Sequence, residues 1–271
     1  MKGYREIFLL KSDLFLLNSL LNTMETINKI SWEIRNDIGI ITLDNPPQNY
    51  LFQPEFVSLE TLKKWTSYDY LKGIIICGAG KHFSGGGKLE NLFSMIRNKE
   101  DISENMEKGK AVLDHLESLD IPVVAAIQGI CFGGGLEVAL ACHIRVCSGN
   151  SLFAFPEINQ GVIPGLGGTV RCYGKSGFPR AIKLIMSGDM INAEDAQEMN
   201  IVDFIVAKQK VFDFSFNFLL KLTKDRPLEV INAVMKALKN ARTLSIGEAM
   251  KEETRMFCEL ALAEAKRRNG S

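Results

Sequence analysis

Two glutamates stand in sequence settings that could give a carboxylate a chemical role. Glu137 follows the glycine run at 133–135 and leads directly into the apolar stretch V-A-L-A-C. A carboxylate in the first turn of a helix gains from the helix dipole, and that alone accounts for many such glutamates. Because this segment is apolar on every side, however, we expect Glu137 to be buried, with a raised pKa that suits acid–base chemistry.

Two glycine loops, S-G-G-G at 84–87 and G-G-G at 133–135, each follow an apolar run and precede a predicted helix. The first N–H groups of a helix have no intrahelical partner, so they can receive a developing negative charge. One such loop is common and indicates little about function. Two loops could direct two donors at one oxygen, which is an oxyanion hole suited to an enolate or a tetrahedral acyl intermediate.

The second glutamate, Glu157, lies in F-A-F-P-E-I just after a predicted strand. Taken alone, this position is more typical of a solvated loop residue. The intervening strands should return the chain beside the start of the Glu137 helix, so that both carboxylates could face one pocket. Paired carboxylates beside an oxyanion hole fit proton transfer at the carbon next to a thioester carbonyl.

The elements that must position these residues follow a repeated order of strand, glycine turn and helix. The runs G-I-I-I-C and P-V-V-A-A-I-Q are continuously apolar, which is typical of strands buried on both faces. With further helices outside, this order predicts an α/β layered fold. We expect strands at 31–35, 39–43, 73–77, 122–128, 144–147 and 152–155. We expect helices at 54–66, 88–97, 104–118 and 136–142, then mostly helical sequence after Pro164, including 227–268.

The composition argues against several classes of protein. The 32 basic and 32 acidic residues balance, which disfavours a nucleic-acid or anionic-membrane surface over the whole molecule. The six cysteines form no C-x-x-C pair and no zinc-like spacing, so we expect reduced thiols in a cytoplasmic protein without a metal site. Residues 5–21 are apolar but interrupted by Lys11 and Asp13, and they lack the features of a signal peptide. We therefore expect no membrane span. The segment is either an amphipathic helix or, as we favour, an upstream addition to a domain that begins near Met24.

Four longer motifs stand in order along the chain. They are H-F-S-G-G-G-K-L, I-P-V-V-A-A-I-Q-G-I-C-F-G-G-G-L-E-V-A-L-A-C, F-P-E-I-N-Q-G-V-I-P-G-L-G-G-T and R-A-I-K-L-I-M-S-G-D-M-I-N-A-E-D-A, with N-I-V-D after the last. Over about residues 30–265 the chain resembles the crotonase (enoyl-CoA hydratase/isomerase) superfamily. The resemblance implies a spiral of ββα turns and a C-terminal helical region that mediates trimers, which often pair into hexamers. It divides the chain into an N-terminal extension (1–23), a core with the CoA site and active site (24–205) and a helical oligomerisation region (206–271).

The resemblance also implies roles for single residues. The backbone N–H groups of Gly87 and Gly134 would hold the thioester oxygen of an acyl-CoA. Glu137 and Glu157 would position a water for addition across the C2=C3 double bond, with Glu157 as the proton donor to C2. The residues expected to contact the CoA moiety are Gly85, Gly86, Gly87, Lys88, Leu89 and Gly134. CoA is then part of the substrate, no separate cofactor is expected, and an acyl carrier protein thioester is an alternative substrate.

Departures from the family pattern leave alternatives to hydration. Many relatives with isomerase or other activities lack one carboxylate, so the pair favours hydration over double-bond isomerisation. Lys88 stands where many relatives carry Asp, either as a solvated lysine near a phosphate-rich ligand or as a contact for a substrate carboxylate. A decarboxylase of a glutaconyl-type thioester would need the latter. Tyr50 is expected to narrow the acyl or pantetheine region.

Two other classes of protein are alternatives to an enzyme that acts on acyl-CoA. A non-catalytic binding or assembly subunit would keep the fold without needing both glutamates. A dinucleotide-binding enzyme fits poorly, because G-L-G-G at 165–168 is not G-x-G-x-x-G.

Overall fold

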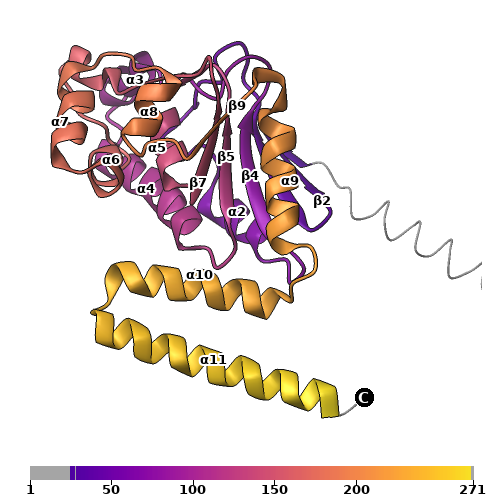
Figure 1. Cartoon of the computed structure of the whole chain (residues 1–271). Helices are drawn as coiled ribbons and strands as arrows, with labels where there is room; N and C mark the ends of the chain where they lie inside the picture. The colour runs from indigo at the N-terminus through magenta and orange to yellow at the C-terminus, as the bar shows by residue number, and fades with distance from the viewer. Residues whose placement is uncertain (1–24, 28, 270–271) are drawn as a thin grey trace, which may run out of the picture.

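A seven-stranded sheet runs through the centre of the molecule in the computed structural model, which describes residues 25–27 and 29–269 (Figure 1). Strands β1 to β3 pair antiparallel, and from β3 onward the neighbours pair parallel, in the order β1-β2-β3-β4-β5-β7-β9. The strands are β1 (Glu25–Ile27), β2 (Ile30–Arg35), β3 (Ile38–Leu43), β4 (Gly73–Gly78), β5 (Val123–Ile127), β7 (Ile144–Ser148) and β9 (Phe204–Val206). The expected N-terminal extension, residues 1–23, lies outside the described residues.

A small second sheet gives the chain its spiral course. β6 (Ile130–Phe132) and β8 (Leu152–Ala154) pair in parallel, and an isolated parallel bridge joins Ser84 to Cys131. Successive turns of the chain therefore place a strand in the large sheet and a short extended segment in the small layer. The predicted strands at 144–147 and 152–155 are confirmed as β7 and β8, but they belong to different sheets and do not pair with each other.

Helices cover both faces of the large sheet. α9 (Val211–Thr223) packs on one face against β3, β4, β5 and β7, and the opposite face is covered by the layer that contains α2, α4 and α5 (Figure 1). The other helices are α2 (Leu59–Thr66), α3 (Leu89–Arg97), α4 (Ile102–Ser118), α5 (Gly134–Ala141), α6 (Gly168–Ser176), α7 (Phe178–Ser187), α8 (Ala193–Glu198), α10 (Leu228–Thr243) and α11 (Ile246–Asn269), with 3-10 turns η1 (Pro156–Gln160) and η2 (Lys208–Lys210).

Strand β4 confirms the predicted burial on both faces. Ile74 and Ile76 belong to the large core beneath α2, α4 and α5, whereas Ile75 belongs to the smaller core beneath α9. On the large-core side, Trp32 and Trp65 stack with their ring centroids 5.4 Å apart. Full burial of each isoleucine of β4 contributes about 1.5–3 kcal/mol to the free energy of unfolding. The central strands are thereby fixed in place, and with them the loops at their carboxyl ends.

Several predicted boundaries differ from the structure for local reasons. Helix α2 begins at Leu59 instead of residue 54, because the Ser58 hydroxyl caps it by accepting a hydrogen bond from the Thr61 N–H. The sequence pattern does not predict β6 or β9, since three-residue strands are too short to show a period. Both occur where strand pairing is decided by distant parts of the chain.

The last two helices form a pair at the edge of the molecule. α10 and α11 pack against each other below the sheet and its covering helices, as Figure 1 shows in orange and yellow. This confirms the predicted helical C-terminal region. Over the described part of the chain, no helix combines the length and apolarity needed to cross a membrane.

Candidate active site

The two glycine loops meet, as the sequence predicts. An ideal Cβ on Gly134 would lie 3.6 Å from the Gly87 nitrogen, and one on Gly86 would lie 3.0 Å from the Gly134 nitrogen. Gly134 begins α5, so its N–H has no intrahelical acceptor. The Leu51 N–H donates to the Gly86 carbonyl at 2.9 Å, and in a trans peptide the carbonyl and the next N–H point in opposite directions, so the Gly87 N–H points away from Leu51. Among the described residues neither amide has an acceptor, which leaves two neighbouring donors for one oxygen.

Glycine is required for this close approach. Gly133 has φ 49° and ψ −125°, a conformation that L side chains rarely adopt. Gly86 has φ 81°, and a Cβ there would lie 2.6 Å from the Phe132 carbonyl oxygen. The Ser84 hydroxyl fixes the first loop by accepting from the Gly86 N–H at 3.1 Å and donating to the Asn49 carbonyl at 2.8 Å. The sequence therefore builds a rigid meeting point for the two loops.

Glu137 is buried in the first turn of α5, with 2% of its surface exposed, as predicted. Its Oε1 accepts two backbone hydrogen bonds, from the Leu166 and Gly168 N–H groups, both at 2.7 Å. Burial raises the pKa of Glu137, and the two backbone bonds and the Arg171 charge oppose that rise. A Cβ on Gly168 would lie 2.8 Å from the Glu137 Cγ, so the contact depends on glycine there. This carboxylate is anchored by one oxygen.

Glu157 lies in η1, directly after β8, and its carboxylate contacts the second glycine loop. A Cβ on Gly133 would lie 2.6 Å from the Glu157 Oε1. The Oε2 atom is buried and has no hydrogen-bond partner among the described residues. Burial, and secondarily the negative charge of Glu137, raise the pKa of Glu157 to about 7 against the smaller opposing effect of its own backbone N–H. This carboxyl group is therefore poised to exchange a proton near neutral pH.

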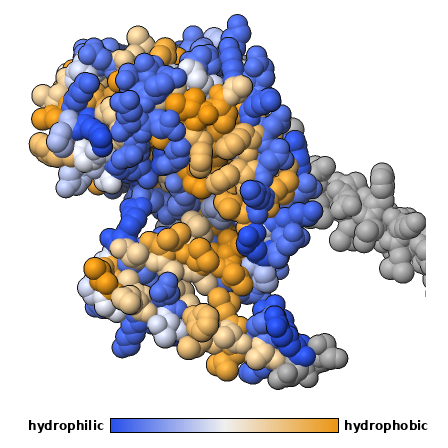
Figure 2. Space-filling model, in the orientation of Figure 1, coloured by the Kyte–Doolittle hydropathy of each residue, from blue (hydrophilic) through white to orange (hydrophobic). Residues whose placement is uncertain are grey.

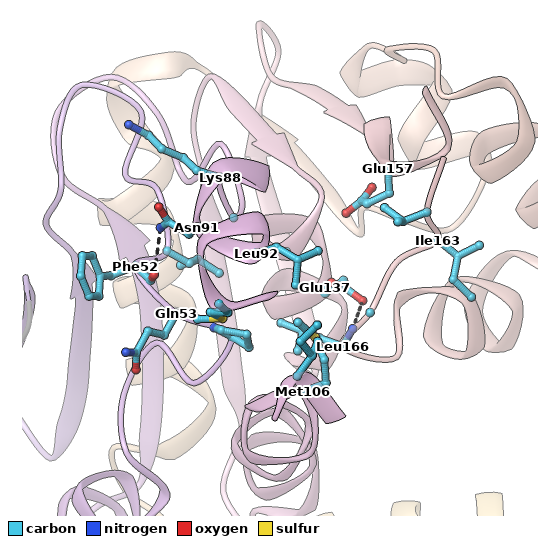
Figure 3. A pocket seen from close by; sticks show the side chains of 18 residues that line it. Phe52, Gln53, Lys88, Asn91, Leu92, Met106, Glu137, Glu157, Ile163 and Leu166 are labelled. Carbon is cyan, nitrogen blue, oxygen red and sulfur yellow. Dashed lines mark hydrogen bonds between the residues drawn. The ribbon is translucent and has the colours of Figure 1, made fainter. Parts of the chain in front are cut away.

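A cavity of about 280 Å3 brings these groups together. Gly87, Gly134, Glu137 and Glu157 all line it, and Figure 3 shows the two carboxylates approaching it from different elements. Beyond them, α3, α4 and the loop before α6 contribute an apolar lobe. Its lining side chains include Leu92, Met95, Ile102, Met106, Ile163 and Leu166. The cavity thus joins a polar reacting centre to space for a short apolar group.

Of the other residues predicted to bind CoA, Lys88 lines this cavity and Gly85, Gly86 and Leu89 do not. Lys88 lines it, but its Nζ lies 4.8 Å from the centroid of the Tyr50 ring, and its side chain points away from both glutamates (Figure 3). Gly85 and Gly86 are not among the lining residues, and Gly85 is in close contact with Tyr50 instead. Leu89 begins α3. Tyr50 packs beneath the glycine loop and outside the cavity lining.

Sequence reasoning missed the backbone donors to Glu137 and the apolar lobe. Leu166 and Gly168 belong to the motif P-G-L-G-G-T, whose residue types do not indicate that its backbone amides bind a carboxylate. A signal was present, since an apolar helix with one carboxylate requires a partner for that carboxylate from elsewhere in the chain. The partner's identity depends on long-range folding.

The arrangement defines a class of enzyme. Two free amide donors suit an oxygen that gains negative charge, and the two carboxylates beside them have different environments, one anchored and one with an unpartnered oxygen. Such a site suits acid–base chemistry next to a polarised carbonyl.

Comparison with known proteins agrees with this class. Residues 33–271 match the enoyl-CoA hydratase/isomerase family. A relative from Bacillus subtilis (strain 168), described as a probable enoyl-CoA hydratase, is 32% identical over 235 residues, which are 86% of this chain and 90% of the relative. The fatty acid oxidation complex subunit alpha of Idiomarina loihiensis is 34% identical over 232 residues, covering 81% of this chain and 32% of that longer protein. A solved enoyl-CoA hydratase from Bacillus anthracis superposes with a TM-score of 0.75 at 26% identity, covering 84% of this chain and 89% of the other.

This chain belongs to the enoyl-CoA hydratase/isomerase family. The resemblance of its motifs to the crotonase superfamily, and the α/β fold expected from it, are confirmed.

Proposed function

We propose that this protein is an enoyl-CoA hydratase, which adds water reversibly across the C2=C3 double bond of a 2-enoyl-CoA. The observation that carries the proposal is the pair of carboxylates, Glu137 and Glu157, on one cavity beside two free amides. Relatives named enoyl-CoA hydratase support the same reaction and acyl-CoA as the substrate. A reaction that moves a single proton would need only one of these glutamates.

In the proposed mechanism, the thioester oxygen accepts hydrogen bonds from the Gly87 and Gly134 N–H groups. Charge that develops on this oxygen as water attacks C3 is then stabilised by donors already in place. Glu137 is ionised and takes a proton from the water, while Glu157 is protonated and gives its proton to C2. The product carries the hydroxyl on C3 and the new hydrogen on C2. Passage of the proton from Glu137 to Glu157, directly or through solvent, restores the starting state.

The apolar lobe supports a short acyl chain as the group beyond C3. The cavity's volume of about 280 Å3 includes the space of the reacting centre, and Met95, Ile102 and Met106 are among the apolar side chains that line it. The CoA moiety would leave through the mouth beside Lys88, where an ammonium group is near the path of phosphates. An acyl carrier protein thioester would use the same exit.

We also propose that the protein forms a homotrimer or hexamer, and that it is cytoplasmic. The helices α10 and α11 expose many large apolar side chains, visible as orange surface in Figure 2. They include Val234, Leu238, Ile246, Met250, Phe257 and Leu262. Exposed apolar surface of this extent is typical of a subunit interface. All six cysteines are free thiols, which supports a reducing compartment.

Loss of the conjugated ultraviolet absorbance of crotonyl-CoA tests the proposed reaction. We expect turnover by the wild type, and a fall in kcat of at least about 100-fold in both Glu137→Gln and Glu157→Gln. Glu104→Gln is a matched control, since Glu104 is an exposed glutamate of α4 that pairs with Lys108.

The other outcomes identify the alternatives. Turnover that survives Glu137→Gln would indicate a one-carboxylate reaction such as double-bond isomerisation. A wild type that leaves crotonyl-CoA unchanged but releases CO2 from glutaconyl-CoA would replace hydration by decarboxylation. Binding of both esters without turnover would leave a non-catalytic subunit.

A further inference from the structure

Behind the cavity, Arg171 of α6 holds three partners with one guanidinium group. Its Nη1 donates to the Leu166 carbonyl at 2.7 Å, its Nε to Glu117 at 2.9 Å and its Nη2 to Asp114 at 2.5 Å. Only 8% of the Arg171 side chain is exposed. Among charged side chains, a planar fork of this kind is specific to arginine, because the lysine ammonium has neither the shape nor the spread of donors.

The carbonyl that Arg171 binds belongs to a residue whose N–H binds Glu137. Leu166 donates its N–H to the Glu137 Oε1 at 2.7 Å and gives its carbonyl oxygen to Arg171. The turn from Leu166 to Gly168 is therefore held between the guanidinium on one side and the carboxylate on the other. Gly167 permits this with φ 90°, and a Cβ on it would lie 2.6 Å from the Arg171 Nη1.

A second guanidinium extends the contact to the C-terminal helices. Arg242 of α10 donates through Nη1 and Nη2 to the Glu117 Oε1, both at 3.1 Å, while Arg171 binds the other oxygen of Glu117. Burial would raise the pKa of Glu117, but the two guanidinium groups outweigh burial and lower it, so Glu117 stays ionised at neutral pH. A continuous series of bonds thus runs from α10 through Glu117, Arg171 and Leu166 to Glu137.

We propose that Arg171 is a positioning residue for Glu137, and that it acts by fixing the turn whose two N–H groups hold that carboxylate. This role of Arg171 rests on the proposed function, because it requires Glu137 to be a catalytic residue. Arg171 itself does not line the cavity, so it touches no substrate. Glu117 and Arg242 support it from α4 and α10.

Removal of Arg171 should change the behaviour of Glu137 in a defined direction. The charged groups that face Glu137 are Glu157 from η1 and Arg171 from α6, and Arg171 is itself paired with Asp114 and Glu117 of α4. Loss of the Arg171 charge disfavours the ionised form of Glu137. A weaker hydrogen bond from the Leu166 N–H to the Glu137 carboxylate acts in the same direction. The acid limb of the kcat profile therefore moves to higher pH.

The test compares Arg171→Lys, Arg171→Met and Glu117→Gln with the wild type, using crotonyl-CoA. We expect kcat to fall about ten-fold or more in Arg171→Met, with KM little changed, because a misplaced catalytic group slows chemistry without removing a substrate contact. Arg171→Lys should recover only part of the loss. Glu117→Gln should produce a smaller change in the same direction. Arg35→Gln is the matched control, since Arg35 forms an exposed pair with Glu33 on β2.

A measurement that does not use turnover keeps the two proposals separate. Infrared titration of protein labelled with 13C-glutamate, with Glu137 assigned by Glu137→Gln, reports the pKa of that carboxyl group directly. A higher Glu137 pKa in the Arg171 variants supports the positioning role even if the wild type hydrates no enoyl-CoA. If Arg171→Met shows no thermal unfolding transition and is therefore unfolded, the Arg171→Lys and Glu117→Gln variants test the proposal instead. An unchanged Glu137 pKa and an unchanged acid limb in the folded variants overturn the proposal.

Discussion

The two glutamates of this site have different surroundings because the backbone treats the two positions differently. Glu137 receives two N–H groups on one oxygen, whereas Glu157 has a buried oxygen without a partner. Backbone hydrogen bonds favour a carboxylate in its charged form, and burial without them favours the neutral acid. The proposed assignment of Glu137 as base and Glu157 as acid is based on that contrast.

Glu157 should also destabilise the folded protein at alkaline pH. Its pKa of about 7 in the folded state lies above the ordinary value of 4.5, so the folded state binds more protons than the unfolded state between those limits. Stability from this group is complete below about pH 4.5 and falls as pH rises through 7, by about 3 kcal/mol. We expect Glu157→Gln, which cannot ionise, to raise the melting temperature relative to wild type at pH 8 and to have little effect at pH 4.5.

Differential scanning calorimetry at the two pH values provides the measurement. Glu104→Gln, at an exposed glutamate of α4, should show no such pH-dependent gain. Equal effects of Glu157→Gln at both pH values would mean that the folded state does not retain the proton.

At the scale of elements, helix α6 matters because its first turn supplies a donor to Glu137. Gly168→Ala would place a Cβ 2.8 Å from the Glu137 Cγ and 2.9 Å from the Phe155 Cε1, so the helix start must shift. We expect kcat to fall about ten-fold or more, because the hydrogen bond from the Gly168 N–H to Glu137 lengthens and the Glu137 side chain is displaced. The crotonyl-CoA assay measures this directly.

The same helix offers a matched control. A Cβ on Gly174 would meet nothing within 4 Å, and alanine is the better helix former by about 0.5–1 kcal/mol. Gly174→Ala should therefore keep full activity and raise the melting temperature slightly. Full activity in Gly168→Ala as well would show that the position of this turn does not limit catalysis.

Much of this element arrangement can be predicted from the sequence, and the missing part has a physical cause. The apolar runs that become β4 and β5, and the glycine loops that become the meeting point of Gly87 and Gly134, are local signals read directly from residue types. The donors to Glu137 are backbone amides of residues 29 and 31 positions away, and an amide leaves no residue-type signature. The sequence pattern likewise predicts helix where β9 occurs, because this three-residue strand is defined by its pairing with β7.

At the scale of the whole molecule, the C-terminal pair is joined to the body by ion pairs and by a few apolar side chains of α10, Leu228, Ile231 and Met235. Arg242 of α10 binds Glu117 of α4, and Lys239 pairs with Asp120 at 2.6 Å. Among the described side chains of the two helices, Ile231 and Met256 are the buried ones. In a single copy, then, most of the large apolar side chains of the pair are left facing water.

The exposed apolar side chains of α11 predict that other subunits cover this helix. Phe257 of α11 is 69% exposed in the single chain, so replacing it by aspartate should leave the fold intact. If α11 is covered by other subunits, the new carboxylate would be buried there without a partner and would oppose assembly. We expect sedimentation velocity to give a trimer or hexamer for the wild type and smaller species for Phe257→Asp, with Lys251→Asp, an exposed polar position of the same helix, keeping the wild-type state. A monomeric wild type would contradict the assembly, and the apolar face of α11 would then require a partner other than this chain.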